Sequence, residues 1–563
     1  MLYPQSNLFR DVYHLNGIWR FSPVEDSYLP DQPLKSSKPM AVPASYNDIT
    51  TEKALKDHVG KVVYEKVFSL PLRDGLQYRL RIGATSHQCS VYLNGALIGH
   101  GLNGFYPIDL PLDSLQAENR LSVVIDNRLS DQTLPVGEQK NGRQVYHYDF
   151  YNYTGIHRDV MIYTLPVQAI RDLTIQTVVN GDYSAVHVSV DTDCTDLTYT
   201  VKDLAGNTVV VSKHADFRIE DPILWEPSNP HLYTLCVESE CDRYEERFGI
   251  RKIEVKGTQF LLNDRPVYFK GFGMHEDFFV LGKGNNNAVT LRNFECMKWI
   301  HANSFRTSHY PYAEDVLDLA DEYGFLVIDE VPAVGMNRFD GSDCFGEGNL
   351  VTDKTKELHK ELITRLVARD KNHPCVVMLN VGNEPHAEEP ASRDYYLDII
   401  AHARSVCSLP LMLVHCAISE NGVCDHLSDL PDVLGLNRYY SWYYHRLGDV
   451  TDITESLIPD FNGLYQKYQK PIMLTEFGAD TIEGLHALPS DAFSEEFQKD
   501  CIVEYGDVLD TMDFVIGEHV WNFADFQTKQ GLTRIRGNRK GVFTKDRQPK
   551  LVAHFLRERW MKK

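Results

Sequence analysis

The sequence lacks the features that mark membrane, secreted and nucleic-acid-binding proteins. No apolar run approaches the roughly 18 residues of a membrane helix, so we expect no membrane span. No basic segment precedes an apolar run near the N-terminus, so we expect no signal peptide. A nucleic-acid partner needs clustered Lys and Arg, which a formal net charge of −22 disfavours. We therefore expect a cytoplasmic protein without a nucleic-acid or membrane partner.

The eleven cysteines include no CxxC pair, which is the spacing of many zinc and redox sites. Cys375 and Cys416 lie within apolar runs that are typical of buried strands. Buried thiols in a reducing compartment explain this usage, so we expect neither a metal site nor a cofactor. With 43% hydrophobic and 24% charged residues, the 563-residue chain has an ordinary globular composition and room for two or three domains.

Residues 1–165 have the pattern of an all-β domain. Segments 91–99 and 120–129 alternate apolar and polar positions, and Asn94-Gly95 predicts a hairpin turn. Residues 166–257 hold further β-branched segments separated by turn residues, and we expect the run 224–235 to cross the middle of this second unit. These patterns predict two β-sandwiches, the first jelly-roll-like and the second immunoglobulin-like.

From residue 258 onward, apolar strands alternate with helical stretches. Val316, Leu319, Ala320 and Tyr323 share one face of a helix expected near 313–324. The expected strands are 267–273, 304–309, 325–330, 375–384, 411–416, 433–439, 471–478 and 515–523. Eight βα units in about 300 residues predict a (β/α)8 TIM barrel over residues 258–563. A doubly wound open sheet is the alternative, and the lack of GxGxxG after a strand disfavours it.

Two of these strands end in a glutamate. Glu384 follows Asn383 at the end of the fourth strand, and Glu476 closes the seventh. Catalytic groups of such barrels gather at the carboxyl ends of the strands, so both side chains should face one site. A retaining glycosidase needs two carboxyls about 5–5.5 Å apart, one to protonate the leaving oxygen and one to attack the anomeric carbon. Either glutamate alone could instead pair with a neighbouring Arg or Lys.

Several segments of the chain resemble glycoside hydrolase family 2, and within it the β-glucuronidases. They follow the family's order along the whole chain: LNGIWRF, PASYND, YNYTGIHRDV, RTSHYPY, ARDKNHP, LNVGNEP, LNRYYSWY, LTEFGAD, VWNFADF and GNRKGVF. The resemblance implies a sugar-binding sandwich, an immunoglobulin-like sandwich and a catalytic barrel. It also implies hydrolysis of β-glucuronides with retention of configuration, and a homotetramer.

The resemblance further implies roles for individual residues. Glu384 would be the general acid/base, Glu476 the nucleophile, and Tyr439 a tyrosine that donates to the nucleophile. Asn383 is placed to hydrogen-bond the 2-hydroxyl of the sugar. A nearby ionised Glu476 would raise the pKa of Glu384 and keep it protonated. We expect Asp329-Glu330, which closes the third strand, to support the site.

A glucuronide carries a carboxylate at C6, whose recognition needs cationic and amide donors. Asn538 and Lys540 resemble the Asn-x-Lys motif that binds this carboxylate in the family, and Arg534 lies four residues before Asn538. Spacing alone would favour a solvated basic loop. Further candidates for sugar contacts, each of which could instead be structural, are Asp149, His309, Asn437, Tyr443 and Trp521.

The segment Val331–Val351 is much longer than the roughly 2–6 residues usual for a loop after a barrel strand. It resembles the variable active-site loop of gut bacterial β-glucuronidases, so we expect a lid or an aglycone wall, with a disordered insertion as the alternative. For the whole chain, β-galacturonidase, β-galactosidase and β-mannosidase remain open as alternatives. A carbohydrate-binding protein with an inactive barrel is the alternative from another functional class.

Overall fold

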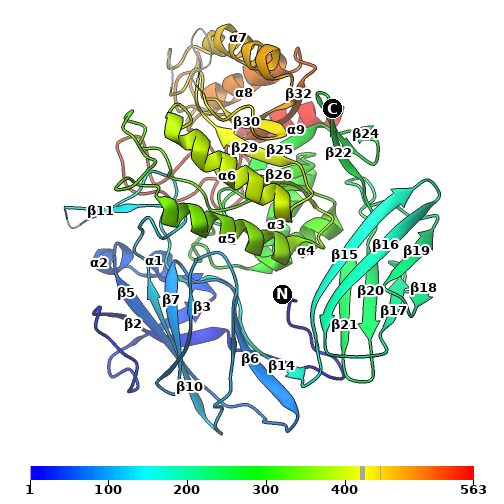
Figure 1. Ribbon diagram of the computed structural model, residues 1–563. Helices are drawn as coiled ribbons and strands as arrows, with labels where there is room; N and C mark the ends of the chain where they lie inside the picture. The colour runs from blue at the N-terminus through cyan, green and yellow to red at the C-terminus, as the bar shows by residue number, and fades with distance from the viewer. Residues whose placement is uncertain (1, 142, 419–424, 444–445) are drawn as a thin grey trace.

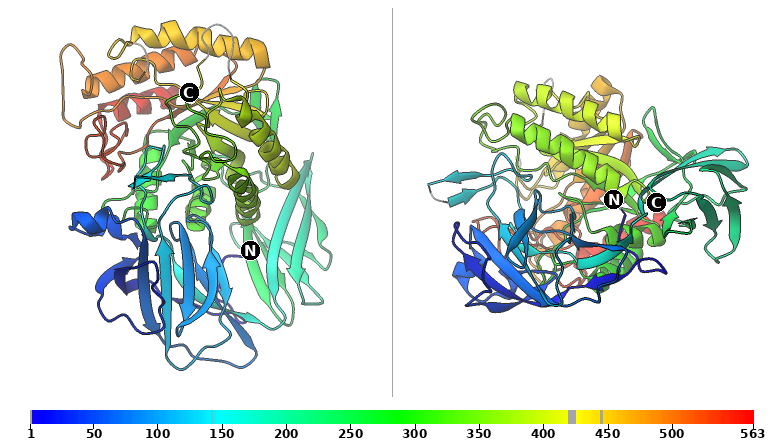
Figure 2. Two further views of the ribbon diagram at one scale, coloured as in Figure 1. Left: turned by 60° about the vertical axis from the view of Figure 1, so that its left-hand side comes forward. Right: turned by 60° about the horizontal axis from the view of Figure 1, so that its bottom comes forward.

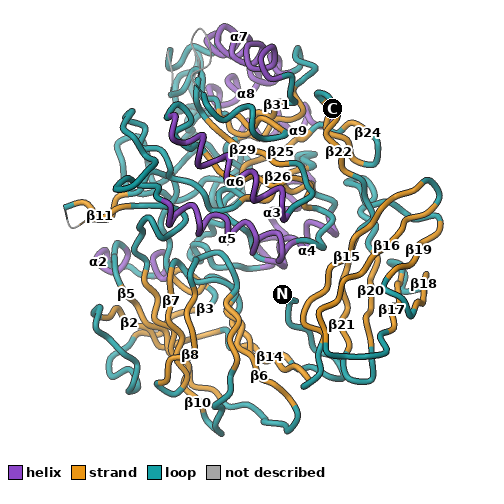
Figure 3. The backbone as a smooth tube through the Cα atoms, in the orientation of Figure 1, coloured by secondary structure: helices purple, strands orange, loops and turns teal. Residues whose placement is uncertain are grey.

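Two β-rich units carry a barrel in the computed structural model, which describes residues 2–141, 143–418, 425–443 and 446–563 (Figure 1). The long helices all belong to the barrel, whereas the other two units consist mainly of strands and loops (Figure 3). Among the described residues, no helix is long and apolar enough to cross a membrane.

The first unit is a β-sandwich of one four-stranded sheet, ordered β1-β14-β6-β9, and one six-stranded sheet, ordered β3-β2-β5-β10-β7-β8. Trp19, Tyr64 and Val123 belong to its core. Asn94 and Gly95 both have positive φ between β7 and β8, so the expected hairpin is present. The strands are β1 Val12–His14, β2 Gly17–Val24, β3 Lys38–Val42, β5 Lys61–Phe68, β6 Leu76–Ile82, β7 Gln88–Leu93, β8 Ala96–Gly101, β9 Ile108–Pro111, β10 Asn119–Asp126 and β14 Val160–Pro166.

Short elements decorate this sandwich. They are the one-turn helices α1 Tyr46–Ile49 and α2 Lys53–Lys56, and the paired strands β4 Ala44–Ser45 with β13 Gly155–Ile156 and β11 Glu138–Lys140 with β12 Arg143–Val145.

The second unit is a smaller sandwich whose sheets are ordered β15-β16-β19 and β18-β17-β20-β21. Its strands are β15 Ile170–Asn180, β16 Tyr183–Thr192, β17 Thr198–Lys202, β18 Thr208–Ser212, β19 Asp216–Glu220, β20 Tyr233–Glu238 and β21 Arg243–Phe248. A three-stranded sheet leads from this unit into the barrel: β22 Ile253–Lys256, β23 Gln259–Leu262 and β24 Arg265–Pro266.

Only the end of the run 224–235 crosses the second unit, where residues 233–235 begin β20 between β17 and β21, so that expectation is confirmed in part. Trp225 is fully buried in the core cluster of the barrel, and its indole N–H donates to the carbonyl oxygen of Asp321 over 2.9 Å. The chain enters a strand only at Tyr233. Large apolar residues near prolines do not reveal whether they are buried within one unit or between two, which explains the difference.

Eight parallel strands close the barrel in sequence order, which confirms the expected fold. They are β25 Phe269–Gly273, β26 Ser304–Arg306, β27 Leu326–Glu330, β28 Val376–Asn383, β29 Leu411–His415, β30 Val433–Asn437, β31 Ile472–Glu476 and β32 Val515–Val520. The helices are α3 Asn287–Trp299, α4 Glu314–Tyr323, α5 Asp353–Asp370, α6 Pro390–Val406, α7 Thr451–Tyr468, α8 Glu495–Leu509 and α9 Leu551–Lys562. The described residues between β29 and β30, namely 416–418 and 425–432, form no helix.

One detail of the barrel differs from expectation. Cys416 follows β29 and is only partly buried, because the strand ends one residue earlier, whereas Cys375 is buried as expected. The face expected on α4 is present, since Val316 and Ala320 are buried and Leu319 and Tyr323 pack against the core. Leu317 is buried in addition.

Each sandwich has a core of its own, and part of the first unit also joins the core of the barrel. Phe105, Tyr148 and Phe150 of the first unit are buried in the same cluster as Trp225 and the barrel strands. Figure 2 shows the barrel resting on both β-rich units, with the N-terminal segment between them. The first sandwich can therefore contribute side chains to the carboxyl-end face of the barrel.

Candidate active site

A cavity of about 500 Å³ lies at the carboxyl ends of the barrel strands. Asn437 and Lys540, although expected at the site, lie directly behind its wall and are fully buried. The other expected site residues all line the cavity: Asp149, His309, Asn383, Glu384, Tyr439, Tyr443, Glu476, Trp521, Arg534 and Asn538.

Glu476 is the last residue of β31 and is held at both carboxylate oxygens. Arg306, the last residue of β26, donates from Nη2 to Oε1 over 2.5 Å. The hydroxyl of Tyr439 donates to Oε2 over 2.8 Å. Because charge-assisted hydrogen bonds favour the ionised acceptor, this arrangement suits a carboxylate that stays charged and fixed in direction.

Glu384 directly follows β28, and its backbone has a φ of 49°. This left-handed conformation is strained for a residue other than glycine, and such strain is concentrated at functional sites. The side-chain amide of Asn437 donates to Oε1 of Glu384 over 2.8 Å. Burial, and after it the charge of Glu476, raises the pKa of Glu384 to about 8, against the lowering effect of Asn437. At neutral pH Glu384 therefore carries a proton.

Sequence reasoning did not assign a role to Arg306, although the segment that contains it was recognised. Its Nη1 donates to Glu330 over 2.6 Å, and Nδ1 of His309 lies 2.8 Å from the same carboxylate. Glu330 thus supports the site, whereas Asp329, the other half of the expected pair, lines a separate cavity. The signal available in the sequence was the position of this arginine at the end of a barrel strand, since catalytic groups gather at the carboxyl ends of such strands.

The first unit contributes Asp149 to one end of the cavity. Nε of Arg534 donates to both of its carboxylate oxygens, over 3.0 and 2.9 Å. The side-chain amide of Asn538 donates to the same carboxylate over 2.9 Å. Asp149 therefore orients a cation and an amide donor that both line the cavity.

Lys540 lies one layer deeper at the same end. Its Nζ is 2.5 Å from Oδ2 of Asp480 and 2.5 Å from the hydroxyl of Tyr443. Burial favours a higher pKa for Asp480, but Lys540 and Arg534 lower it below its ordinary value. The sequence did not point to Asp480, which lies four residues beyond Glu476 in the segment LTEFGAD.

Aromatic and apolar side chains form the remaining walls. Trp521 stacks on His309 with ring centroids 5.1 Å apart and an interplanar angle of 24°. From the long segment Val331–Val351, the side chains of Val334, Arg338 and Phe339 also line the cavity. The Glu389 carboxylate accepts backbone N–H groups of this segment over 2.8 and 3.1 Å, so the segment is held against the barrel.

Among the described residues, two clusters have the composition of a metal site, and both lie outside the cavity lining. Asp321 pairs with His373 over 2.6 Å and sits beside Cys375. The other cluster is Cys344, His386 and Glu389, whose carboxylate accepts the backbone N–H groups noted above. The cysteines within the described ranges are all free thiols.

Three family models match the chain in succession. They are the glycosyl hydrolases family 2 sugar binding domain over residues 12–166, the glycosyl hydrolases family 2 domain over 156–251, and the family's TIM barrel domain over 253–563. The matches follow the order of the two sandwiches and the barrel.

Full-length relatives agree with these matches. The β-glucuronidase of Paenibacillus borealis is 40% identical, with 100% of this chain and 98% of that protein covered. The human β-glucuronidase is 36% identical, with 100% and 92% covered.

Solved structures agree as well. An uncultured Clostridium sp. β-glucuronidase is 43% identical with a TM-score of 0.96, and 100% of both chains is covered. The Ruminococcus gnavus β-glucuronidase in complex with D-glucaro 1,5-lactone is 36% identical with a TM-score of 0.92, and 99% of each chain is covered. By its three domains, its closed barrel and its full-length relatives, this chain belongs to glycoside hydrolase family 2.

Proposed function

We propose that the chain is a retaining β-glucuronidase, which hydrolyses β-D-glucuronides to glucuronate and the free aglycone through a covalent glycosyl-enzyme intermediate. The observation that carries the proposal is a single cavity with Glu384 and Glu476 at its base and Arg534 with Asn538 at one end. The carboxyl pair suits glycoside hydrolysis. The cation and the amide suit a sugar that carries its own carboxylate.

In the first step, Glu384 gives its proton to the glycosidic oxygen while Glu476 attacks the anomeric carbon. The raised pKa of Glu384, about 8, supplies that proton at neutral pH. Arg306 and Tyr439 donate hydrogen bonds to the two oxygens of the attacking carboxylate and hold it in position. In the second step, the now ionised Glu384 removes a proton from water, and the water releases the sugar from Glu476.

The sugar itself is held by the rest of the cavity. We assign its C6 carboxylate to the end where Arg534 and Asn538 are fixed by Asp149, with Lys540 supplying positive charge from behind. Asn383 is assigned to the 2-hydroxyl, and the face of Trp521 to the C–H face of the ring. Arg338 and Phe339 lie at the side left for the aglycone.

A panel of p-nitrophenyl glycosides tests the proposal. We expect the β-glucuronide to be hydrolysed with the highest kcat/KM and the β-galactoside and β-mannoside to be poor substrates, because they lack the carboxylate. A preference for the β-galacturonide would support the assigned carboxylate site but would show that the enzyme selects the other epimer at C4 of the sugar. Binding of glucuronate without turnover of any glycoside would indicate an inactive barrel.

Two further proposals concern the setting of the enzyme. A cytoplasmic location is proposed from the cysteine usage, and fractionation of the producing cell tests it. A homotetramer is proposed from the family resemblance, and light scattering coupled to size-exclusion chromatography tests it against the 64.4 kDa mass of one chain.

A further inference from the structure

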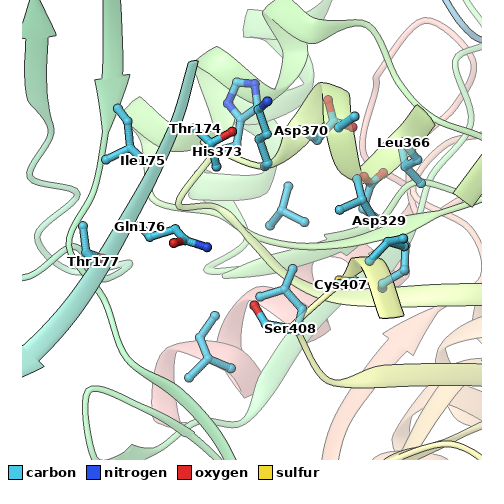
Figure 4. A pocket seen from close by; sticks show the side chains of 18 of the residues that line it. Thr174, Ile175, Gln176, Thr177, Asp329, Leu366, Asp370, His373, Cys407 and Ser408 are labelled. Carbon is cyan, nitrogen blue, oxygen red and sulfur yellow. The ribbon is translucent and has the colours of Figure 1, made fainter. Parts of the chain in front are cut away.

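A second cavity, of about 700 Å³, lies between the second unit and the barrel. We refer to it as the interdomain cavity. Strand β15 forms one wall, and the end of α5, the start of β28 and the turn after α6 form the others (Figure 4). Its volume exceeds that of the catalytic cavity and falls within the range of about 300–1,000 Å³ in which small-molecule sites lie. Domain interfaces are a preferred location for such sites.

The wall between the two units is fixed. The side-chain oxygen of Asn372 accepts the backbone N–H of Ile175 over 3.0 Å, and its amide donates to the carbonyl of Leu173 over 2.9 Å. Lys371 is ion-paired with Asp172 over 2.5 Å. These contacts join β15 to the barrel beside the cavity, so its walls are preformed.

One cation of the cavity wall, Arg251, has no ion-pair partner in the part of the chain that the structure describes. Nη2 of Arg251 donates to the carbonyl of Val376 over 2.7 Å, while its buried Nε has no hydrogen-bond partner among the described residues. No carboxylate of those residues lies within ion-pair distance of this guanidinium, and burial lowers the pKa of Arg251. By contrast, Lys371 and His373 are each paired with an aspartate. The wall therefore keeps one positive charge that the protein does not neutralise.

The acidic side chains of the wall do not oppose an anion. Burial, followed by the neighbouring charge of Asp370, raises the pKa of Asp329 well above its ordinary value, which favours the neutral form of this carboxyl. Asp370 is paired through both oxygens with Arg369, over 2.6 Å each. Arg251 is thus the uncompensated charge of the site.

Apolar side chains also contribute to the walls. Side chains that line the cavity include Ile253, Leu366, Val367, Val376, Leu379 and Leu409. Contact with such a surface favours a ligand with an apolar body. An isolated buried cation is costly and is stabilised by a paired anion.

We propose that the interdomain cavity binds an amphipathic monoanion, a small molecule with an apolar body and one carboxylate or sulfonate that pairs with Arg251. The site is separate from the catalytic cavity, because the two share no lining residue. It does not depend on which glycoside the enzyme hydrolyses.

The test is a fluorescence titration of the purified full-length protein with anilinonaphthalene sulfonate, a dye that carries one sulfonate on an apolar body. We expect saturable binding of one dye per chain. Octanoate should displace the dye, and octylamine should displace it at least about tenfold less well, because octylamine cannot form the hydrogen-bonded charge pair, whose loss weakens binding by about that factor. Equal displacement by both would overturn the assignment to an anion, and a lack of saturable binding would overturn the site.

Variants locate the site. Ser408→Trp places a large ring at the rim, where Ser408 is exposed and lines the cavity, and should abolish displacement by octanoate (Figure 4). Ser405→Trp is the matched control, because Ser405 is exposed in the last turn of α6, three residues before Ser408, and is outside the lining. If the Ser408→Trp variant binds octanoate as tightly as the Ser405→Trp variant does, the site lies elsewhere and the proposal fails.

The charge is tested by Arg251→Gln, which should weaken octanoate about tenfold or more, and by Arg251→Lys, which should keep most of the affinity. Hydrolysis of p-nitrophenyl glucuronide by each variant reports that the barrel is folded. If Arg251→Gln fails to fold, the Arg251→Lys variant and the two Ser→Trp variants still decide the proposal. A tenfold loss of octanoate affinity in Arg251→Lys would contradict it, and so would octanoate binding in Ser408→Trp.

Discussion

Lys540 and Asp480 form a buried ion pair beside the catalytic cavity, with side-chain exposures of 0% and 3%. The lysine expected to recognise the sugar carboxylate therefore already has an acidic neighbour within the protein. Arg534 also reaches Asp480 over 3.3 Å, so the two cations share it. Arg534 is paired with Asp149 as well, so two cations and two carboxylates form one network that holds Arg534 and Lys540 in place beside the cavity.

Lys540→Ala should lower kcat/KM for p-nitrophenyl glucuronide by roughly 10²–10³, because truncating one partner of a buried charge pair costs about 2–5 kcal/mol. Hydrolysis of the corresponding glucoside, which has a neutral group at C6, should change little. The ratio of the two rate constants is the measurement. The double variant Lys540→Ala/Asp480→Asn is the control, since it removes the stranded carboxylate too. A uniform loss on both sugars would assign Lys540 to the fold.

Glu476→Gln should reduce hydrolysis by several orders of magnitude while the protein stays folded, because it removes the attacking charge and keeps the size of the side chain. In the unmodified enzyme, a glucuronide inactivator with fluorine at the second carbon should label Glu476, which peptide mass spectrometry would detect. Label on another carboxylate, with Glu476 unmodified, would contradict the assignment.

Glu384→Ala should spare the first step for substrates with good leaving groups, which need little protonation. Added azide should then restore turnover and give the β-glycosyl azide, identified by its anomeric coupling constant in proton NMR. An α-azide product would mean that the enzyme inverts, or that the two glutamates have exchanged roles.

The basic limb of the kcat/KM profile should lie near pH 8, because Glu384 must be protonated and its pKa is about 8. Asn437 donates to the ionised carboxylate and so lowers this pKa. Asn437→Ala should therefore move the basic limb to higher pH, by roughly one unit, since a hydrogen bond to a charged group contributes about 1.5 kcal/mol. A limb that stays in place or moves to lower pH would show that another group sets it.

Phe339→Ala should slow the hydrolysis of glucuronides with bulky aglycones more than that of p-nitrophenyl glucuronide. This side chain is 58% exposed at the tip of the long segment and lines the cavity. Phe279→Ala is the matched control, because Phe279 is 73% exposed and lies outside the lining. Equal effects of Phe339→Ala on both kinds of substrate would remove the aglycone role of the segment.

The barrel was predictable because most of its strands are rich in apolar residues and are followed by stretches with helical periodicity, a pattern that local sequence carries. Glu384 and Glu476 were predictable for the same reason, since Glu384 directly follows such a strand and Glu476 ends one. Trp225 was misplaced, because its burial depends on a partner surface on α4 that lies about one hundred residues away in the chain.

The polar network behind the cavity could not be predicted in the same way. Arg306, Glu330 and Glu476 come from three different strands, and only closure of the barrel brings their charges together. Asp480 and Lys540 are sixty residues apart, and no local pattern connects them. The resemblance identified Lys540, but its complete burial depends on how the loops pack.

The first sandwich contributes Asp149 to the catalytic cavity. There its carboxylate accepts hydrogen bonds from Arg534 and Asn538 of the barrel. Recombination between family members at the domain boundary would thus separate Asp149 from Arg534 and Asn538, the two donors that it orients. A barrel grafted onto a foreign sandwich would keep both glutamates and lose the acceptor that aligns its carboxylate donors. Such a chimera should still cleave glycosides while discriminating poorly between acidic and neutral sugars, so selection on substrate choice acts on both domains together.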